Sequence, residues 1–114
     1  MTAAIFAIVD PDVLLTVQAT LLFGQREHAR LDVFEAVEMV GNRAERTKYT
    51  YHAQYENDFL FRYDLNPSQH PEMPEHKHLP PDRRIPWDRV TRHDVAEELH
   101  SMVAEREGEE EAET

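Results

Sequence analysis

The sequence contains no cysteine, and this absence excludes two classes of structure. Neither disulfide bonds nor zinc sites built on thiolates can stabilise the chain, which fits a reducing compartment such as the cytosol. Lysine is scarce as well, because only Lys48 and Lys77 among the twelve basic residues are lysine. Together with an excess of acidic residues, this choice of cations indicates a protein from a salt-rich cytoplasm, where repulsion between like charges is screened.

The sequence also lacks a hydrophobic run long enough to cross a membrane. The first residues, Met1 to Val9, are apolar, but no cationic residue precedes them. Asp10-Pro11-Asp12 then ends the run far short of a signal sequence or a membrane span. The sequence therefore predicts a cytoplasmic protein that does not contact a membrane.

The chain does have enough length for one domain, and it carries a large negative charge. Its 114 residues suffice for one modest hydrophobic core. The formal net charge is -11, and residues 105–114 hold six glutamates and one arginine, which leaves -6 on the rest. We expect a single domain over residues 1–104 and an acidic, disordered tail over residues 105–114 that contributes solubility.

Four segments carry the signature of β-strands. Apolar and polar residues alternate over 13–23, 49–55 and 59–64. Residues 31–40 fit either a helix or a strand, and their position between two strands favours a strand. A short hairpin loop at Glu56-Asn57-Asp58 joins two of the segments. This order predicts a small antiparallel sheet of about four strands in a meander.

The hairpin over residues 49–64 predicts which side chains share a face. A three-residue turn sets a register in which His52 lies opposite Arg62, and Thr50 opposite Asp64. The aromatic side chains then form one row on the other face: Tyr49, Tyr51, Tyr55, Phe59, Phe61 and Tyr63. We interpret this row as hydrophobic core under a helix, although it would also suit a platform for stacking bases.

Proline and histidine dominate the segment that follows the hairpin. Residues 65–88 contain six prolines and three of the seven histidines, which predicts a long, ordered, functional loop held to the domain by Trp87. Thr91 and Asp94 then have the spacing of a capping box, and apolar residues follow at helical spacing. The sequence predicts a C-terminal helix across the apolar face of the sheet, and hence an α+β fold.

The segment from Arg62 to His78 gathers acid, base and anion-binding groups. Histidine titrates near neutral pH and suits both proton transfers of acid–base catalysis without a metal, so we take four residues as candidate catalytic groups: Asp64, His70, His76 and His78. Four more are candidates for binding substrate: His52, Arg62, Tyr63 and Lys77. In an extended segment Lys77 projects away from His76 and His78, so it either anchors an anionic substrate or pairs with Asp64.

Two other interpretations of these residues stay open. His76 and His78, with Asp64 or His70, offer ligands that suit zinc, manganese or iron. Their spacing matches no recognised zinc motif, so we expect neither a metal nor a cofactor. The segment would otherwise be solvated surface, in which Arg62 and Asp64 form an ion pair worth less than about 1 kcal/mol.

Arg62-Tyr63-Asp64, His70-Pro71 and His76-Lys77-His78, followed by a terminal helix, resemble the TumE family of toxin–antitoxin proteins. The resemblance extends over roughly the C-terminal two thirds of the chain, from the hairpin onward. It implies a small toxin that acts on RNA and is encoded beside a helix-turn-helix antitoxin, which would be its partner.

Two functions from different classes therefore compete. The first is a ribonuclease-like toxin whose histidine-rich loop holds the site. The second is a non-enzymatic protein that binds a helix-turn-helix regulator through the same loop and its acidic surface. A net charge of -11 repels RNA and favours the second function, unless cations gather locally or salt screens the charge. The sequence leaves the oligomeric state open, a dimer included.

Overall fold

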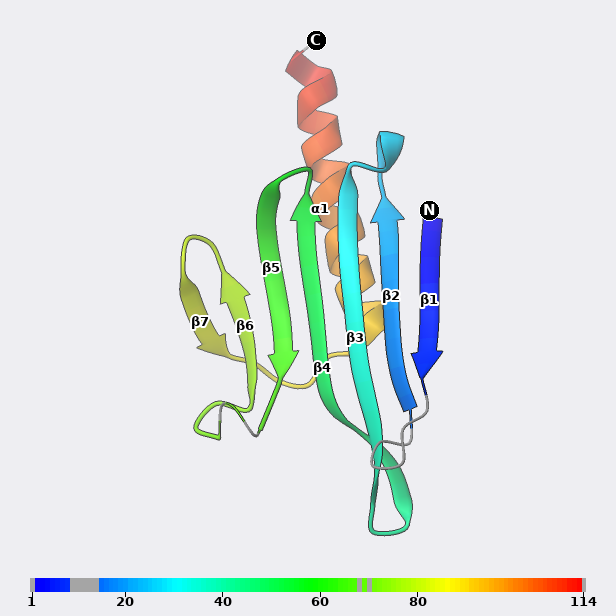
Figure 1. The fold of residues 1–114 in the computed structure, drawn as a ribbon. Coiled ribbons are helices and arrows are strands. Elements are labelled where there is room, and N and C mark those ends of the chain that lie inside the picture. Colours follow the sequence, from blue (N-terminus) through cyan, green and yellow to red (C-terminus); the bar gives the residue numbers. More distant parts are fainter. Residues whose placement is uncertain (1, 9–14, 68, 70, 114) are drawn as a thin grey trace.

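The computed structural model describes residues 2–8, 15–67, 69 and 71–113, and it has an α+β fold (Figure 1). One antiparallel sheet of seven strands lies against one long helix. The strands are β1 (Thr2–Ile8), β2 (Leu15–Phe23), β3 (Ala29–Val40), β4 (Arg43–Tyr55), β5 (Asp58–Leu65), β6 (Glu75–Leu79) and β7 (Arg83–Pro86); a 3-10 turn, η1 (Gln25–Glu27), follows β2, and the helix is α1 (Arg92–Glu113).

The sheet is a meander, as the sequence predicts, but over the described residues it has seven strands instead of about four. Each strand pairs antiparallel with its neighbours along the chain, in the order β1 to β7. The four predicted strands correspond to β2, β3, β4 and β5, and the ambiguous segment 31–40 is a strand. The opening strand β1 was not expected, because it is an apolar run with no clear alternation.

The other two additional strands lie in the segment that we expected to be one long loop. Residues 75–79 and 83–86 form β6 and β7, a hairpin at the end of the sheet. We did not predict this hairpin because proline is unfavourable inside strands. Pro80 and Pro81, however, lie in the turn between β6 and β7. Pro86 ends the outermost strand, where a missing N–H group costs the sheet no hydrogen bond.

The register of the β4–β5 hairpin is confirmed at its chemically important end. His52 lies opposite Arg62 and Thr50 lies opposite Asp64. Nearer the turn, a β-bulge shifts the pairing between Ala53 and Gln54, so Phe59 pairs with Gln54 and not with Tyr55. A bulge inserts one residue and turns those beyond it to the opposite face. Phe59 therefore packs edge-on against the His52 ring, 5.3 Å between centroids, and is not in the core row.

Helix α1 covers one face of the sheet and buries the hydrophobic core. The capping box at its start is confirmed, since the Asp94 N–H donates to Thr91 Oγ1 and the Thr91 N–H donates to Asp94 Oδ2, each at 3.1 Å. The core consists of hydrophobic side chains from the helix and four strands: Val95, Leu99 and Val103 from α1, five aromatic residues of the predicted row (Tyr49, Tyr51, Tyr55, Phe61, Tyr63), Phe23 of β2, Leu65 of β5, and smaller residues of β3 and β4.

The helix extends through the acidic segment to Glu113. Two of its residues contact turns of the sheet: Glu107 accepts a hydrogen bond from the Gln25 N–H at 2.7 Å, and Arg106 pairs with Asp58 at 2.6 Å. The first part of this segment is thus helical and docked in the structure, whereas we expected a disordered tail from residue 105; the division into domain and tail stays a prediction. Over the described residues, no helix is both long and apolar enough to cross a membrane.

Candidate functional site

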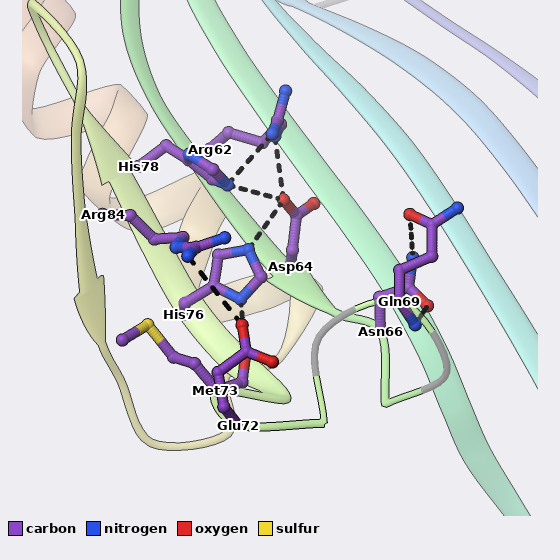
Figure 2. A network of polar contacts seen from close by, with 9 residues as sticks. All are labelled: Arg62, Asp64, Asn66, Gln69, Glu72, Met73, His76, His78 and Arg84. Atoms are coloured by element: carbon purple, nitrogen blue, oxygen red, sulfur yellow. Dashed lines mark hydrogen bonds and ion pairs between the residues drawn. The ribbon is translucent and has the colours of Figure 1, made fainter.

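The face of the sheet opposite α1 carries the polar residues of three neighbouring strands, and we call it the open face. Arg62 and Asp64 of β5 pair with His78 and His76 of β6, respectively. Because side chains alternate along a strand, these four residues share the open face. His52 of β4 adjoins them through its pairing with Arg62. The close-up in Figure 2 shows the four side chains pointing toward one another.

Three side chains converge on one carboxylate oxygen, Asp64 Oδ2. Arg62 Nε donates to it at 2.9 Å, and the Nε2 atoms of His76 and His78 lie 3.3 and 3.1 Å away (Figure 2). Arg62 Nη2 also lies 3.0 Å from His78 Nε2. This arrangement brings together Asp64, His76, His78 and Arg62, as the sequence predicts.

Burial divides the cluster into an inner and an outer part. The His76 side chain is 0% exposed and that of Asp64 is 11% exposed, whereas His78 is 23% and Arg62 is 38% exposed. The Nδ1 atom of His76 lies 2.9 Å from the backbone carbonyl oxygen of Met73, which fixes Nδ1–H as the donor. His76 is therefore placed to orient Asp64, while His78 and Arg62 are accessible to a substrate.

The accessible histidines favour their neutral form. Burial lowers the pKa of His78 below its ordinary value, and the nearby Arg62 guanidinium lowers it further, although Asp64 opposes both effects. Burial and the same guanidinium also lower the pKa of His52. Both rings are thus able to accept a proton at neutral pH, as a general base must.

Two open pockets flank Arg62 on this face, and His52 lines both of them. One, of about 390 Å³, lies toward the β6–β7 hairpin and is also lined by Phe59, His78 and Arg83. The other, of about 270 Å³, is lined by polar side chains of β4, β5 and the following loop: Thr50, His52, Arg62, Asp64, Asn66 and Gln69. A substrate lying across the open face would contact Arg62 from both sides.

Tyr63 and Lys77, two predicted substrate-binding residues, lie on the opposite face of the sheet. Lys77 Nζ pairs with Glu98 of α1 at 2.9 Å, so it is not the partner of Asp64. It also lies 4.8 Å from the ring centroids of Tyr63 and Trp87, and the Tyr63 hydroxyl donates to the same glutamate. The structure therefore does not bring Lys77 and Tyr63 to the cluster. His70, the remaining candidate, lies outside the described residues.

Three residues of this face were missed in the sequence. Asn66 and Gln69 line the smaller pocket and are joined by a 2.9 Å hydrogen bond, but no sequence pattern marks loop residues of this kind. Arg83 lines the larger pocket from β7, and a correct interpretation of the β6–β7 hairpin would have found it. The open face therefore has a cation, Arg83, that the sequence analysis did not assign to it.

The cluster also has the ligand types of a metal site. One ligand atom from each of Asp64, His76 and His78 lies within 4.8 Å of the other two. Over the part of the chain that the structure describes, this is the one such group of histidine and acidic residues.

Comparisons with known proteins agree with the resemblance found in the sequence. The model of the family described as Toxin TumE matches residues 6–110, which extends the similarity across nearly the whole chain. No curated protein and no solved structure matches the chain.

Proposed function

The chain belongs to the TumE toxin family and is thereby the toxin component of a toxin–antitoxin system, and we propose that it acts by cleaving RNA on its open face without a metal. The observation that carries the proposal is the position of Arg62 between two histidines, His52 and His78, that line one pocket and whose pKa values are lowered. A cation for the phosphate and two groups for proton transfer are what this reaction requires.

The roles follow from what each side chain contacts. His78 removes the proton of the ribose 2′-hydroxyl, because Asp64 lies 3.1 Å from its Nε2 atom and stabilises the imidazolium that forms. The 2′-oxygen then attacks the phosphorus, and the bond to the 5′-oxygen breaks. His52, on the other side of Arg62, first takes up a proton from solvent and then supplies it to that oxygen; its lowered pKa makes its imidazolium a stronger acid for this step. Arg62 binds the phosphate, whose negative charge grows during the attack.

The buried residues take supporting roles in this proposal. His76 was a candidate for direct proton transfer, but its side chain is fully buried and contacts Asp64. We assign it to positioning the carboxylate that in turn orients His78. Truncating His76 should therefore misplace Asp64 without removing a group that touches RNA.

RNA binding by an acidic protein requires a local concentration of positive charge. Arg62, Arg83 and one acidic residue, Asp82, line the larger pocket, so positive charge exceeds negative charge where the phosphate would bind despite the net charge of -11. A salt-rich cytoplasm, which the scarcity of lysine indicates, would screen the repulsion from the acidic remainder.

A second candidate function is binding to the partner without catalysis. Met39 and Val40, at the end of the β3–β4 hairpin, are 55% and 48% exposed, which suits a contact with another protein. We propose that the partner is a helix-turn-helix antitoxin. If the toxin acts by binding alone, this hairpin would matter more than the open face.

Growth after induced expression separates the two functions. We expect arrest by the wild-type chain, relief by the product of the adjacent gene, and loss of arrest in the double variant His52→Gln/His78→Gln. RNA cleavage by the purified double variant should be lower by about 10²–10⁴-fold, the usual contribution of acid–base groups. The matched control is His93→Gln, an exposed histidine of α1 that pairs with Glu97, and it should arrest growth normally. A folded double variant that still arrests growth would contradict catalysis and favour the binding function.

A further inference from the structure

Asp64, His76 and His78 have the spacing of ligands around a metal ion. Bonds of about 2.0–2.2 Å to zinc in a tetrahedral site place two ligand atoms about 3.4 Å apart. Asp64 Oδ2 lies 3.3 Å from His76 Nε2 and 3.1 Å from His78 Nε2, which are close to this separation. The two imidazole nitrogens are at most 4.8 Å apart, so a modest rotation of one ring completes the set.

The hydrogen bonding of His76 leaves the correct nitrogen facing the site. Its Nδ1 atom bonds the Met73 carbonyl at 2.9 Å, and this contact keeps the proton on Nδ1 (Figure 2). Nε2 is then the nitrogen that faces Asp64, and it is the one available to bind an ion. A carbonyl that holds the distal nitrogen of a histidine is the usual outer support of a metal ligand. With His76 fully buried, that ligand is held in place before any ion arrives.

A positively charged group, the Arg62 guanidinium, already contacts these candidate ligands. It lies against two of the three, Asp64 at 2.9 Å and His78 at 3.0 Å. The side chain is 38% exposed on the open face and is flanked by pockets on both sides, so it has room to move away. A divalent ion would carry more charge than Arg62 and would bond all three ligands together.

We propose that Asp64, His76 and His78 bind one divalent transition-metal ion, of the zinc, manganese or iron class, and that the bound ion blocks the RNA-cleaving site. Two histidines and one carboxylate are the ligand set that suits these metals. The ion takes His78 Nε2 away from its contact with Asp64, which supports the proposed base, and it takes the carboxylate that holds Arg62. The inhibitory half of this inference rests on the proposed function, whereas the metal site itself does not.

Metal binding is measured first on the full, untagged chain, freed of metal with a chelator and dialysed against zinc. We expect one tightly bound zinc ion per chain, with affinity lower by more than about 100-fold in His78→Gln and in Asp64→Asn, since even outer-shell changes cost about 10–100-fold. His76→Gln should lose zinc affinity to a similar extent. If His76→Gln does not fold, the zinc affinities of His78→Gln and Asp64→Asn test the proposal. The matched control is the double variant His93→Gln/His100→Gln, in which two histidines of α1 are replaced. Equal affinity in all variants, or no tight site, would overturn the proposal.

RNA cleavage with and without zinc then tests the inhibitory half. We expect cleavage by the metal-free chain, its suppression by one equivalent of zinc, and its recovery on adding a chelator. Cleavage that needs zinc would overturn inhibition and make the ion a cofactor. Tight zinc binding without cleavage under either condition would support the site and overturn the proposed function, so the two failures are distinguishable.

Discussion

The two faces of this sheet are built from the same strands but have different chemistry. The face under α1 buries aromatic rings from β4 and β5, whereas the open face gathers arginine, aspartate and histidine side chains from the same two strands and from β6. Strand β6 shows the division within three residues, because Lys77 pairs with Glu98 of the helix while His76 and His78 approach Asp64. Stability and the proposed chemistry are therefore assigned to alternate residues of one strand.

The largest expected effect comes from removing a core side chain of α1, which should destabilise the covered face of the sheet. Leu99 is 0% exposed at the centre of the helix–sheet contact, so Leu99→Ala should lower the free energy of unfolding by about 2–5 kcal/mol. RNA cleavage well below the midpoint of unfolding should be unchanged, because Leu99 does not contact the open face. Urea unfolding measures the first quantity, and His100→Ala, at an exposed neighbouring position, is the control. A stable Leu99→Ala chain would show that the helix contributes little to folding.

Replacing Lys77 should have a smaller effect on stability. This change tests directly whether alternate residues of β6 serve stability and the proposed chemistry. Lys77→Met removes the partner of Glu98 while keeping the apolar stem among the aromatic rings, and it should lower the free energy of unfolding by about 1–3 kcal/mol. Cleavage per folded molecule should not change. His78→Gln is the matched comparison one position along the strand and should show the reverse pattern. Lost cleavage at full stability in Lys77→Met would restore the role in substrate binding predicted from the sequence.

The smallest expected effect concerns the start of α1 and depends on pH. Hydrogen bonds from the backbone and side chain of Thr91 lower the pKa of Asp94 below its ordinary value of 3.8. A lowered folded-state pKa means that the ionised carboxylate stabilises the helix above pH 3.8, and that this contribution is lost as the pH falls through the lowered value. Asp94→Asn should therefore have a lower Tm than the wild type at neutral pH and an equal one in strong acid. A difference in Tm that is constant with pH would contradict this role.

The parts of the fold that were predictable are those in which alternation decides the structure. The hydrophobic period located β2 to β5, and it placed His52 opposite Arg62 because the aromatic row had to lie on one face. The bulge beside Gln54 was not predictable from the same rule, since one inserted residue changes the face of Phe59 without changing the composition. The capping box was predictable because two residues make it locally.

The sequence predicted which residues form the candidate site, but not how deeply each side chain is buried. Arg62, Asp64, His76 and His78 were selected for their chemistry, and the pairing of β5 with β6 brings them together. The burial of His76 follows from the β6–β7 hairpin, which proline obscured. Lys77 looked like a phosphate ligand because the sequence does not show that Glu98, twenty-one residues later, would lie against it.

The strictly sequential order of the strands has a consequence for how the chain assembles. Each strand pairs with its neighbour along the chain, and the connections from β2 to β5 and from β6 to β7 have at most five residues, so much of the sheet can grow one hairpin at a time with little loss of loop entropy. The helix that covers the aromatic face is encoded after all seven strands. During synthesis one face of the sheet therefore stays apolar and exposed until α1 emerges. A chain interrupted before residue 92 would be prone to aggregate while still carrying every residue proposed to act on RNA.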